Sequence, residues 1–259
     1  MADYLNGEFG KIFSESTIFR ALKRRNITWK KSTFYYLEHI PLLGSISKYT
    51  DKVKLLPQSQ IIALDECGFN LGETSRYSWS FRGSRSFVLK PGQRGFNHTL
   101  ILCVRNVKKE GVISYKLIKN EMGEKKKKDK KEKDKETKKG TTAIDFYEFI
   151  KNINLPTNDK YYLLLDNAKI HHATKTLEKL GLLTIKELIL SKNIEPLYLV
   201  SYSPQLNPVE KIFNVVRHNI EKSRPRTFEE LKSAVDKEME RLNKEDLTKY
   251  FKSCLNYFD

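Results

Sequence analysis

Three acidic residues stand at positions where an enzyme could use them together. Asp65 closes the apolar run at residues 61–64, and Asp166 closes the run at residues 161–165. Both are therefore expected at the carboxyl ends of strands, where the functional groups of open α/β sheets gather. Glu210 lies at the start of an expected helix. Carboxylates brought together without a cation repel one another and raise each other's pKa, so the pattern indicates a metal site.

The ligand type suggests which metal and which chemistry. Hard oxygen ligands favour Mg²⁺ or Mn²⁺. With two such ions, one activates water or a 3′-hydroxyl and the other stabilises the leaving oxygen of a phosphoryl transfer. That is the chemistry of nucleases and strand transferases. A single Asp at a strand end is more often a turn former or a helix cap, so the prediction depends on the combination.

The surrounding apolar patterns predict the elements that position these acids. Strands are expected at 61–65, 161–166 and 196–200, and a three-stranded meander at 77–81, 99–104 and 112–117. Helices are expected over 142–153 and 174–180, and from 207 and 227 onward. The helix from 207 has Glu210 at the margin of a stripe with the spacing of a buried face: Val209, Ile212, Phe213, Val216 and Ile220. The helix from Thr227 has Leu231, Val235 and Met239 on one face.

The chain divides into a segment at 1–31, a linker at 32–58 and an α/β body at 59–259. In the first segment, Gly10 marks a turn, Ser14 or Ser16 caps a helix, and Ile18, Ala21 and Leu22 share one helical face. The opposite face is basic, with Arg20, Lys23, Arg24 and Arg25. This pattern fits the last helix of a helix-turn-helix that contacts DNA, or an ordinary amphipathic surface helix.

Composition favours an intracellular protein with a polyanionic partner. The formal net charge is +16, and residues 121–139 account for little of it, since they hold ten Lys but also six acids. Such a balance suits DNA, because Lys and Arg neutralise phosphates. We see neither a signal peptide nor an apolar run of about 20 residues that could span a membrane. Three scattered cysteines predict free thiols.

Residues 121–140 form a Lys-rich tract that has almost no apolar residue to bury. We expect this insertion to be disordered or a solvated charged helix. The adjacent His171 and His172 do not form a zinc motif, because neighbouring side chains point in different directions. Trp79 is expected in the core rather than as a base-stacking group.

Four phrases occur in the order of a known catalytic domain: DECGF at 65–69, YSWSFRG at 77–83, LDNAKIH at 165–171 and YSPQLNPVE at 202–210. Together they resemble the mariner-like DDE transposases and related insertion-sequence transposases. Residues 1–31 are similar to the end of that family's DNA-binding region. The resemblance covers nearly the whole chain except the Lys-rich tract.

The resemblance implies a ribonuclease H-like fold, an α/β mixed sheet flanked by helices, with a small partial helix-turn-helix before it. It implies that Asp65, Asp166 and Glu210 are the catalytic residues and hold two Mg²⁺ or Mn²⁺ ions. It also implies cleavage at terminal inverted repeats of double-stranded DNA and strand transfer into TA-type targets by a homodimer. Asn207 would start the helix that bears Glu210, in which Pro208 suits the first turn. Such a protein acts in the nucleus of a eukaryote, or in the cytoplasm and nucleoid of a prokaryote.

Asn167 and His171 follow the second Asp in the family phrase. They are expected either to orient ligands or contact DNA, or to be a local capping Asn and a surface His.

Two departures from the family pattern are visible. Forty-three residues separate Asp166 from Glu210, more than the family's usual spacing, and we expect the extra length within 182–193 as a helix or loop. The N-terminal segment holds at most part of one helix-turn-helix, whereas the family usually has two. Two other classes remain open: a domesticated or decayed derivative that binds DNA without cutting it, and a plain metal-dependent nuclease.

Overall fold

The computed structural model describes residues 7–10, 12–28, 42–71, 80–87, 97–120, 141–156 and 159–256. The chain forms two compact units, residues 1–40 and 41–259. The predicted Lys-rich tract and Trp79 lie outside the described residues. None of the described helices is both long and apolar enough to cross a membrane.

The smaller unit contains the expected basic helix, α2 (Glu15–Arg24). Ser14 is its N-cap, and the Ser14 hydroxyl accepts a hydrogen bond from the Thr17 N–H at 3.3 Å. Gly10 has a φ of +60°, which suits the predicted turn because this backbone region favours glycine. No residue of α2 is buried within the described structure.

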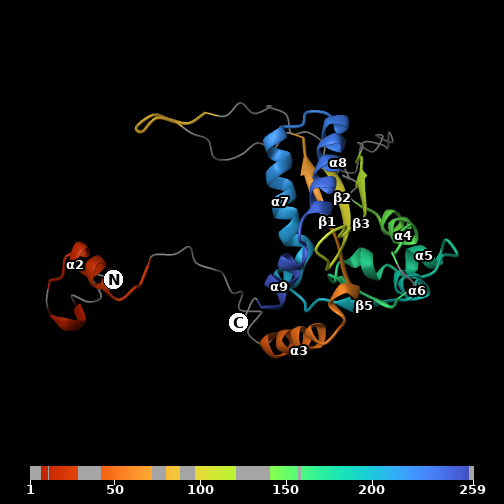
Figure 1. Ribbon diagram of the computed structural model, residues 1–259, viewed down its shortest axis with the longest axis horizontal. Helices are drawn as coiled ribbons and strands as arrows, with labels where there is room; N and C mark the ends of the chain where they lie inside the picture. Colours follow the sequence, from red (N-terminus) through yellow and green to blue (C-terminus); the bar gives the residue numbers. More distant parts are fainter. Residues whose placement is uncertain are drawn as a thin grey trace, which may run out of the picture. The chain divides into compact units, whose positions relative to one another are not determined.

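The elements of the larger unit follow one another in this order: α3 (Leu43–Lys54), η2 (Gln58–Gln60), β1 (Ile61–Asn70), β2 (Asn97–Arg105), β3 (Val112–Ile118), α4 (Ala143–Lys151), β4 (Tyr161–Leu165), η3 (Lys169–His172), α5 (Lys175–Glu178), α6 (Ile185–Ser191), β5 (Ile194–Tyr198), η4 (Pro204–Leu206), α7 (Pro208–Ser223), α8 (Phe228–Lys244) and α9 (Thr248–Leu255). The η elements are short 3-10 helices. Figure 1 shows these elements along the chain.

A five-stranded mixed sheet forms the centre of this unit, in the order β3-β2-β1-β4-β5. β1, β2 and β3 pair antiparallel as a meander, and β4 and β5 join β1 as parallel strands. The predicted mixed α/β sheet is confirmed.

Three expectations about the strands need correction. The meander begins with β1 and not with residues 77–81: residues 77–79 lie outside the described structure, and residues 80–87 contain no strand. β1 does not end at Asp65 but continues to Asn70, because it keeps its pairing with β2 along that length. β5 begins two residues earlier than expected, at Ile194.

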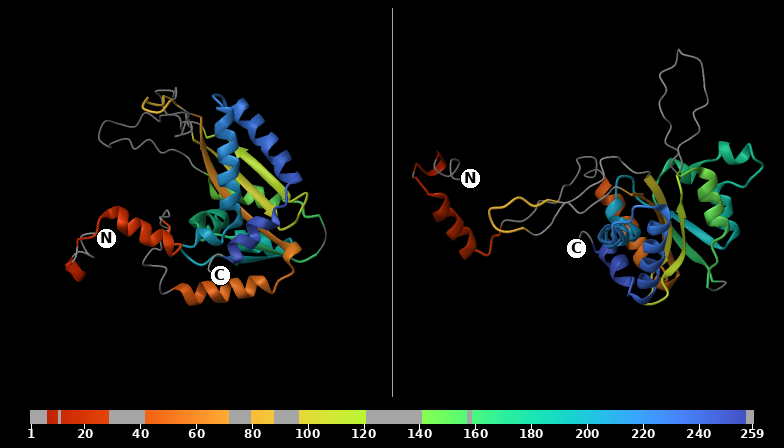
Figure 2. Two further views of the ribbon diagram at one scale, coloured as in Figure 1. Left: turned by 60° about the vertical axis from the view of Figure 1, so that its left-hand side comes forward. Right: turned by 90° about the horizontal axis from the view of Figure 1, so that it is seen from above.

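Helices cover both faces of the sheet, as the right panel of Figure 2 shows. α3, α7, α8 and α9 pack on one face around one hydrophobic core, and α4, α5 and α6 pack on the other around a second core. Successive strand residues point to opposite faces. In β1, Ile61 and Ala63 enter the α7 core, while Ile62 and Leu64 enter the α4 core. Alternation therefore assigns Asp65 to the α7 face and Glu66 to the α4 face.

The helices predicted from residues 142, 207 and 227 onward are confirmed, and each begins at an N-cap residue. Thr142 forms a capping box with Asp145, and the Thr227 hydroxyl accepts a hydrogen bond from the Glu230 N–H. The predicted apolar stripes of α7 and α8 are buried. The helix expected over 174–180 is the shorter α5.

One segment differs in role from its prediction, and another is helical as one alternative had it. The expected linker at 32–58 contains α3, whose Ile46 and Val53 are buried in the α7 core, so α3 is part of the larger unit. The stretch at 182–193, expected to hold extra length as a helix or loop, contains the helix α6, whose Ile185 and Ile189 are buried in the α4 core.

Candidate active site

Asp65 lies where two neighbouring strands separate. The pairing of β1 with β4 ends at Ala63 and Leu164, whereas β1 continues beside β2. Only 7% of Asp65 is exposed. Its Oδ1 accepts a hydrogen bond from the Glu66 N–H at 2.7 Å, and its Oδ2 accepts one from the Asn207 side chain at 2.8 Å. Asp65 therefore lies just beyond the end of the β1–β4 pairing, and not at the end of β1.

Asn207 joins Asp65 to the helix that bears Glu210. It is the N-cap of α7, and its Oδ1 accepts a hydrogen bond from the Val209 N–H at 3.1 Å. Its amide Nδ2 donates to Asp65 instead. One buried amide therefore caps α7 and fixes the position of that helix relative to β1.

Glu210 lies in the first turn of α7, on an exposed margin of the buried stripe as predicted. Partial desolvation, and then the negative charge of Asp166, raise the pKa of Glu210 above its usual range. Arg217, two turns further along α7, opposes this rise. Its guanidinium donates a hydrogen bond to the Cys67 sulfur at 2.9 Å and lies 5.4 Å from the centre of the Phe69 ring.

Asp166 directly follows β4, as predicted. Its Oδ1 accepts a hydrogen bond from the Ala168 N–H at 2.9 Å and lies 2.7 Å from Nδ1 of His171. The side chain remains 44% exposed. Burial favours a higher pKa, but the hydrogen bonds from His171 and Ala168 outweigh it and lower the pKa of Asp166.

The charges of the three acids act on one another. Burial, and then the charges of Glu66, Glu210 and Asp166, raise the pKa of Asp65 to about 8, although the hydrogen bond from the Glu66 N–H opposes the rise. Asp166 in turn raises the pKa of Glu210. The structure thus brings Asp65 of β1, Asp166 after β4 and Glu210 of α7 into one electrostatically coupled cluster.

His171 is buried on the α4 face and is not the surface histidine of the alternative prediction. Its ring stacks on Phe146 with the ring centres 4.3 Å apart, and its Nε2 lies 3.1 Å from Oε1 of Glu66. Burial opposes the charged imidazolium, but hydrogen bonds to Asp166 and Glu66 outweigh it and raise the pKa of His171 to about 10. His172 points elsewhere and packs its ring against Tyr198, with the ring centres 4.5 Å apart.

Sequence reasoning missed Glu66 and Arg217. Alternation along β1 could have indicated Glu66, since it places a carboxylate on the face of the sheet that the α4 core covers. Arg217 follows Glu210 at a spacing of seven, which returns to the same side of a helix.

Asn167, another predicted supporting residue, joins two segments of the larger unit. The Asn167 side chain donates a hydrogen bond to the Leu199 carbonyl at 2.5 Å, which joins the end of β4 to the segment after β5. The contact spans 32 residues of sequence, so Asn167 is not the local capping Asn of one alternative.

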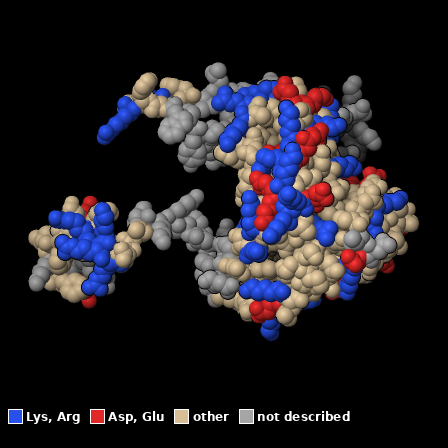
Figure 3. All heavy atoms as spheres, viewed as in Figure 1, with Lys and Arg blue, Asp and Glu red and all other residues tan. Residues whose placement is uncertain are grey.

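The predicted DNA-binding side chains Arg20, Lys23, Arg24 and Arg25 are exposed on the smaller unit, in α2 or directly after it. Figure 3 shows Lys and Arg gathered on that unit. On the visible face of α7 and α8, in contrast, basic and acidic side chains alternate. The charge of that face alone therefore does not mark a path for DNA.

The acid cluster fits divalent cations by charge and by ligand type. Its oxygens are hard ligands, and a cation would relieve the repulsion that raises the pKa values of Asp65 and Glu210. Within the described ranges, no three His, Cys, Asp or Glu side chains already converge as the ligands of one ion.

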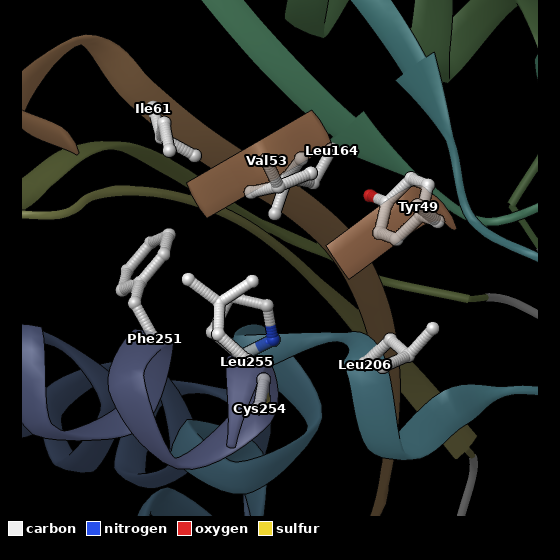
Figure 4. Close-up of a pocket in the computed structure, with 9 residues that line it drawn as sticks. Tyr49, Val53, Ile61, Leu164, Leu206, Phe251, Cys254 and Leu255 are labelled. Carbon is white, nitrogen blue, oxygen red and sulfur yellow. The ribbon is translucent and has the colours of Figure 1, made fainter. Parts of the chain in front are cut away.

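A small cavity lies on the α7 side, lined by residues that include Tyr49, Ile61, Leu164, Leu206 and Cys254 (Figure 4). Its volume is about 10 Å³, enough for no more than about one water molecule. It is a packing defect rather than a ligand site.

The three cysteines are free and buried, as predicted for free thiols.

Comparison with known proteins shows what part of the chain resembles in sequence. Residues 122–232 match the sequence family described as DDE superfamily endonuclease. This stretch includes Asp166 and Glu210 and begins after Asp65. No curated protein matches the chain in sequence.

Solved structures of Mos1 transposase resemble the chain. A Mos1 paired-end complex with the left transposon end has a TM-score of 0.66 and 17% identity, over 98% of this chain and 69% of that chain. A Mos1 paired-end complex with Mg has a TM-score of 0.65 and 15% identity, over 99% of this chain and 74% of that chain. The Mos1 mariner catalytic domain has a TM-score of 0.54 and 16% identity, over 87% of this chain and 91% of that chain.

The larger unit thus has a ribonuclease H-like fold, like the Mos1 catalytic domain. The family match bears out the predicted resemblance to the DDE superfamily, and the fold is like that of the Mos1 mariner transposase.

Proposed function

We propose that the protein is a DDE transposase that cleaves DNA at transposon ends and joins the freed ends to target DNA, with divalent metal ions as cofactors. The observation that carries the proposal is the coupling of Asp65, Asp166 and Glu210. These residues come from three separate elements, and mutual repulsion helps to raise the pKa values of Asp65 and Glu210. Carboxylates that repel one another in this way are expected where they bind a metal cation in the functional state, rather than a proton.

In this proposal Asp65, Asp166 and Glu210 hold two Mg²⁺ or Mn²⁺ ions. When bound, such ions activate the attacking hydroxyl and stabilise the leaving oxygen of an in-line phosphoryl transfer. Asn207 keeps Asp65 in place through its hydrogen bond and sets the start of α7, and therefore the position of Glu210. The report of a Mos1 paired-end complex with Mg supports the choice of metal.

The proposed substrate is double-stranded DNA that carries terminal inverted repeats, with a TA-type target and a homodimer that holds two ends. The support is the likeness to Mos1, whose structures are described as paired-end complexes. Arg20, Lys23, Arg24 and Arg25 would contact phosphates, since exposed guanidinium and ammonium groups on one short helix form a compact positive surface.

The test uses the purified full chain and a supercoiled plasmid that contains the DNA flanking its coding sequence. We expect nicks at the element ends with Mg²⁺ or Mn²⁺, and none with EDTA. Asp166→Asn and Glu210→Gln should abolish nicking. Glu229→Gln is the matched control, because Glu229 occupies the first turn of α8 as Glu210 does in α7.

Each outcome separates the alternatives. Nicking that is lost in the acid variants, followed by joining of the freed ends to a second plasmid, supports a transposase. Nicking without joining identifies a plain nuclease. DNA binding with no metal-dependent nicking by the wild type identifies a non-catalytic derivative and rejects the proposal.

A further inference from the structure

A buried chain of contacts runs from one strand of the sheet to Asp166. Glu66 on β1 approaches Nε2 of His171 at 3.1 Å, and Nδ1 of His171 approaches Oδ1 of Asp166 at 2.7 Å. The side chain of His171 is fully buried, and Glu66 is 13% exposed. An ion pair with one partner this deeply buried is maintained only when its geometry is well defined on both sides.

The orientation of the His171 ring is fixed from three directions. Phe146, itself fully buried in the α4 core, stacks on one face of the ring. Glu66 and Asp166 engage the two ring nitrogens. A rotation of the ring would break both polar contacts, so His171 transmits the position of β1 to the carboxylate that follows β4.

The contact selects which oxygen of Asp166 remains for other partners. The Ala168 N–H and His171 both engage Oδ1. Within the described part of the chain these contacts leave Oδ2 as the oxygen that can take a metal ion. Asp166 needs such a restraint, because it has left the strand and 44% of its side chain is exposed.

We propose that His171 and Glu66 are a positioning pair for the metal-binding carboxylate of Asp166: Glu66 orients His171, and His171 holds Oδ1 so that Oδ2 is presented to the ion. The inference rests on the proposed metal-dependent function. It parallels the restraint of Asp65, which Asn207 holds from the opposite face of the sheet. Partners that orient metal ligands typically change metal affinity by roughly 10–100-fold when they are removed.

The pair acts in series, so its two members should be coupled in Mn²⁺ binding. Among the contacts of the described residues, Glu66 reaches Asp166 through His171. The effect of Glu66→Ala on metal binding should therefore disappear when His171 is already Ala. Residues in contact are non-additive in stability as well, so thermal unfolding of the same four proteins shows whether the coupling in Mn²⁺ affinity exceeds any coupling in stability.

The chain offers a conservative rescue and a matched control. In His171→Asn, the amide nitrogen takes a position like Nδ1 and can still donate to Asp166. In His171→Gln, the longer side chain places its amide nearer the position of Nε2. His172→Ala is the control, because the neighbouring His172 is exposed and packs on Tyr198 instead.

The experiment measures Mn²⁺ binding to the full chain without DNA, by electron paramagnetic resonance of the free ion, with thermal unfolding of every variant in EDTA as a folding check. We expect roughly 10–100-fold weaker binding in His171→Ala and Glu66→Ala. The double variant should match His171→Ala, His171→Asn should regain part of the affinity, and His172→Ala should bind as the wild type does. In a plasmid nicking assay, saturating Mn²⁺ should recover activity in His171→Ala.

The failures of the two proposals are distinguishable. If the wild type binds Mn²⁺ and folded His171→Ala binds equally well, the positioning role is wrong while the proposed function stands. Effects that multiply in the double variant would also overturn it. If His171→Ala does not fold, the decision passes to His171→Gln and Glu66→Ala, compared with His171→Asn. Binding as tight as that of the wild type in folded His171→Gln and Glu66→Ala would then reject the positioning role. A wild type that binds no Mn²⁺ would reject the proposed function and this inference with it.

Discussion

Replacement of Asp65 by Asn should stabilise the metal-free protein while it removes activity. Asp65 has a pKa of about 8 in the folded chain and 3.8 as its ordinary value. Folding at pH 7 therefore requires the carboxyl to take up a proton, which costs on the order of 4 kcal/mol at about 1.4 kcal/mol per pH unit. An amide at this position has no such cost.

The substitution also loses one hydrogen bond. The Asp65 carboxylate accepts hydrogen bonds from the Glu66 N–H and from Asn207. An Asn has one acceptor oxygen and can satisfy only one of these donors, at a cost of about 1 kcal/mol. The net gain for Asp65→Asn at pH 7 is thus about 2–3 kcal/mol, or roughly 5–10 °C in melting temperature for a domain of this size.

The sign of the pH dependence follows from the raised pKa. The favourable contribution of protonated Asp65 is fully present below pH 3.8 and is lost as the pH rises to about 8. The advantage of Asp65→Asn should therefore be small at pH 5, grow up to pH 8 and then stay constant.

The assay is thermal unfolding in EDTA at pH 5, 7 and 8.5, with Asp51→Asn as a control at an exposed aspartate of α3. Mn²⁺ should raise the melting temperature of the wild type and leave that of Asp65→Asn nearly unchanged. If Asp65→Asn is less stable than the wild type by the same amount at every pH, the electrostatic reasoning is wrong.

Three further substitutions test the framework of the site. Asn207→Ala should cost at least about 1 kcal/mol in urea unfolding through loss of the α7 cap, and should lower nicking because Asp65 loses its donor; full activity would contradict the link. Ile212→Ala, in the buried stripe of α7, should cost about 2–5 kcal/mol by the same measurement, and a cost below 1 kcal/mol would mean that α7 is loosely packed. Thr142→Ala should cost about 1 kcal/mol through loss of the α4 capping box, with Mn²⁺ binding unchanged; weaker Mn²⁺ binding would show that α4 affects the site beyond its packing.

The sequence predicted the positions of Asp166 and Glu210, because local patterns determine the structure around them. The apolar run before Asp166 ends with its strand, and the Asn-Pro pair before Glu210 predicts the start of α7. The place of Asp65 was predicted less well. Its strand continues through residues 66–70 because these residues pair with β2. The local sequence around Asp65 does not show that a partner strand follows roughly thirty residues later.

Burial against distant segments accounts for the other differences. His171 is buried because Phe146 and Glu66 cover it, and the latter lies 105 residues away in sequence. α3 was assigned to a linker although Ile46, Thr50 and Val53 already have helical spacing. The apolar face of α3 could be assigned to the larger unit only once the core against which it packs was known.

The most direct test of the central claim is a crystal structure of the full chain with Mn²⁺, in which anomalous scattering locates the ions. The account predicts ions bound by carboxylate oxygens of Asp65, Asp166 and Glu210 at roughly 2.0–2.3 Å, with Oδ1 of Asp166 still on His171. Ions bound elsewhere, or none at these three residues at saturating Mn²⁺, would contradict it.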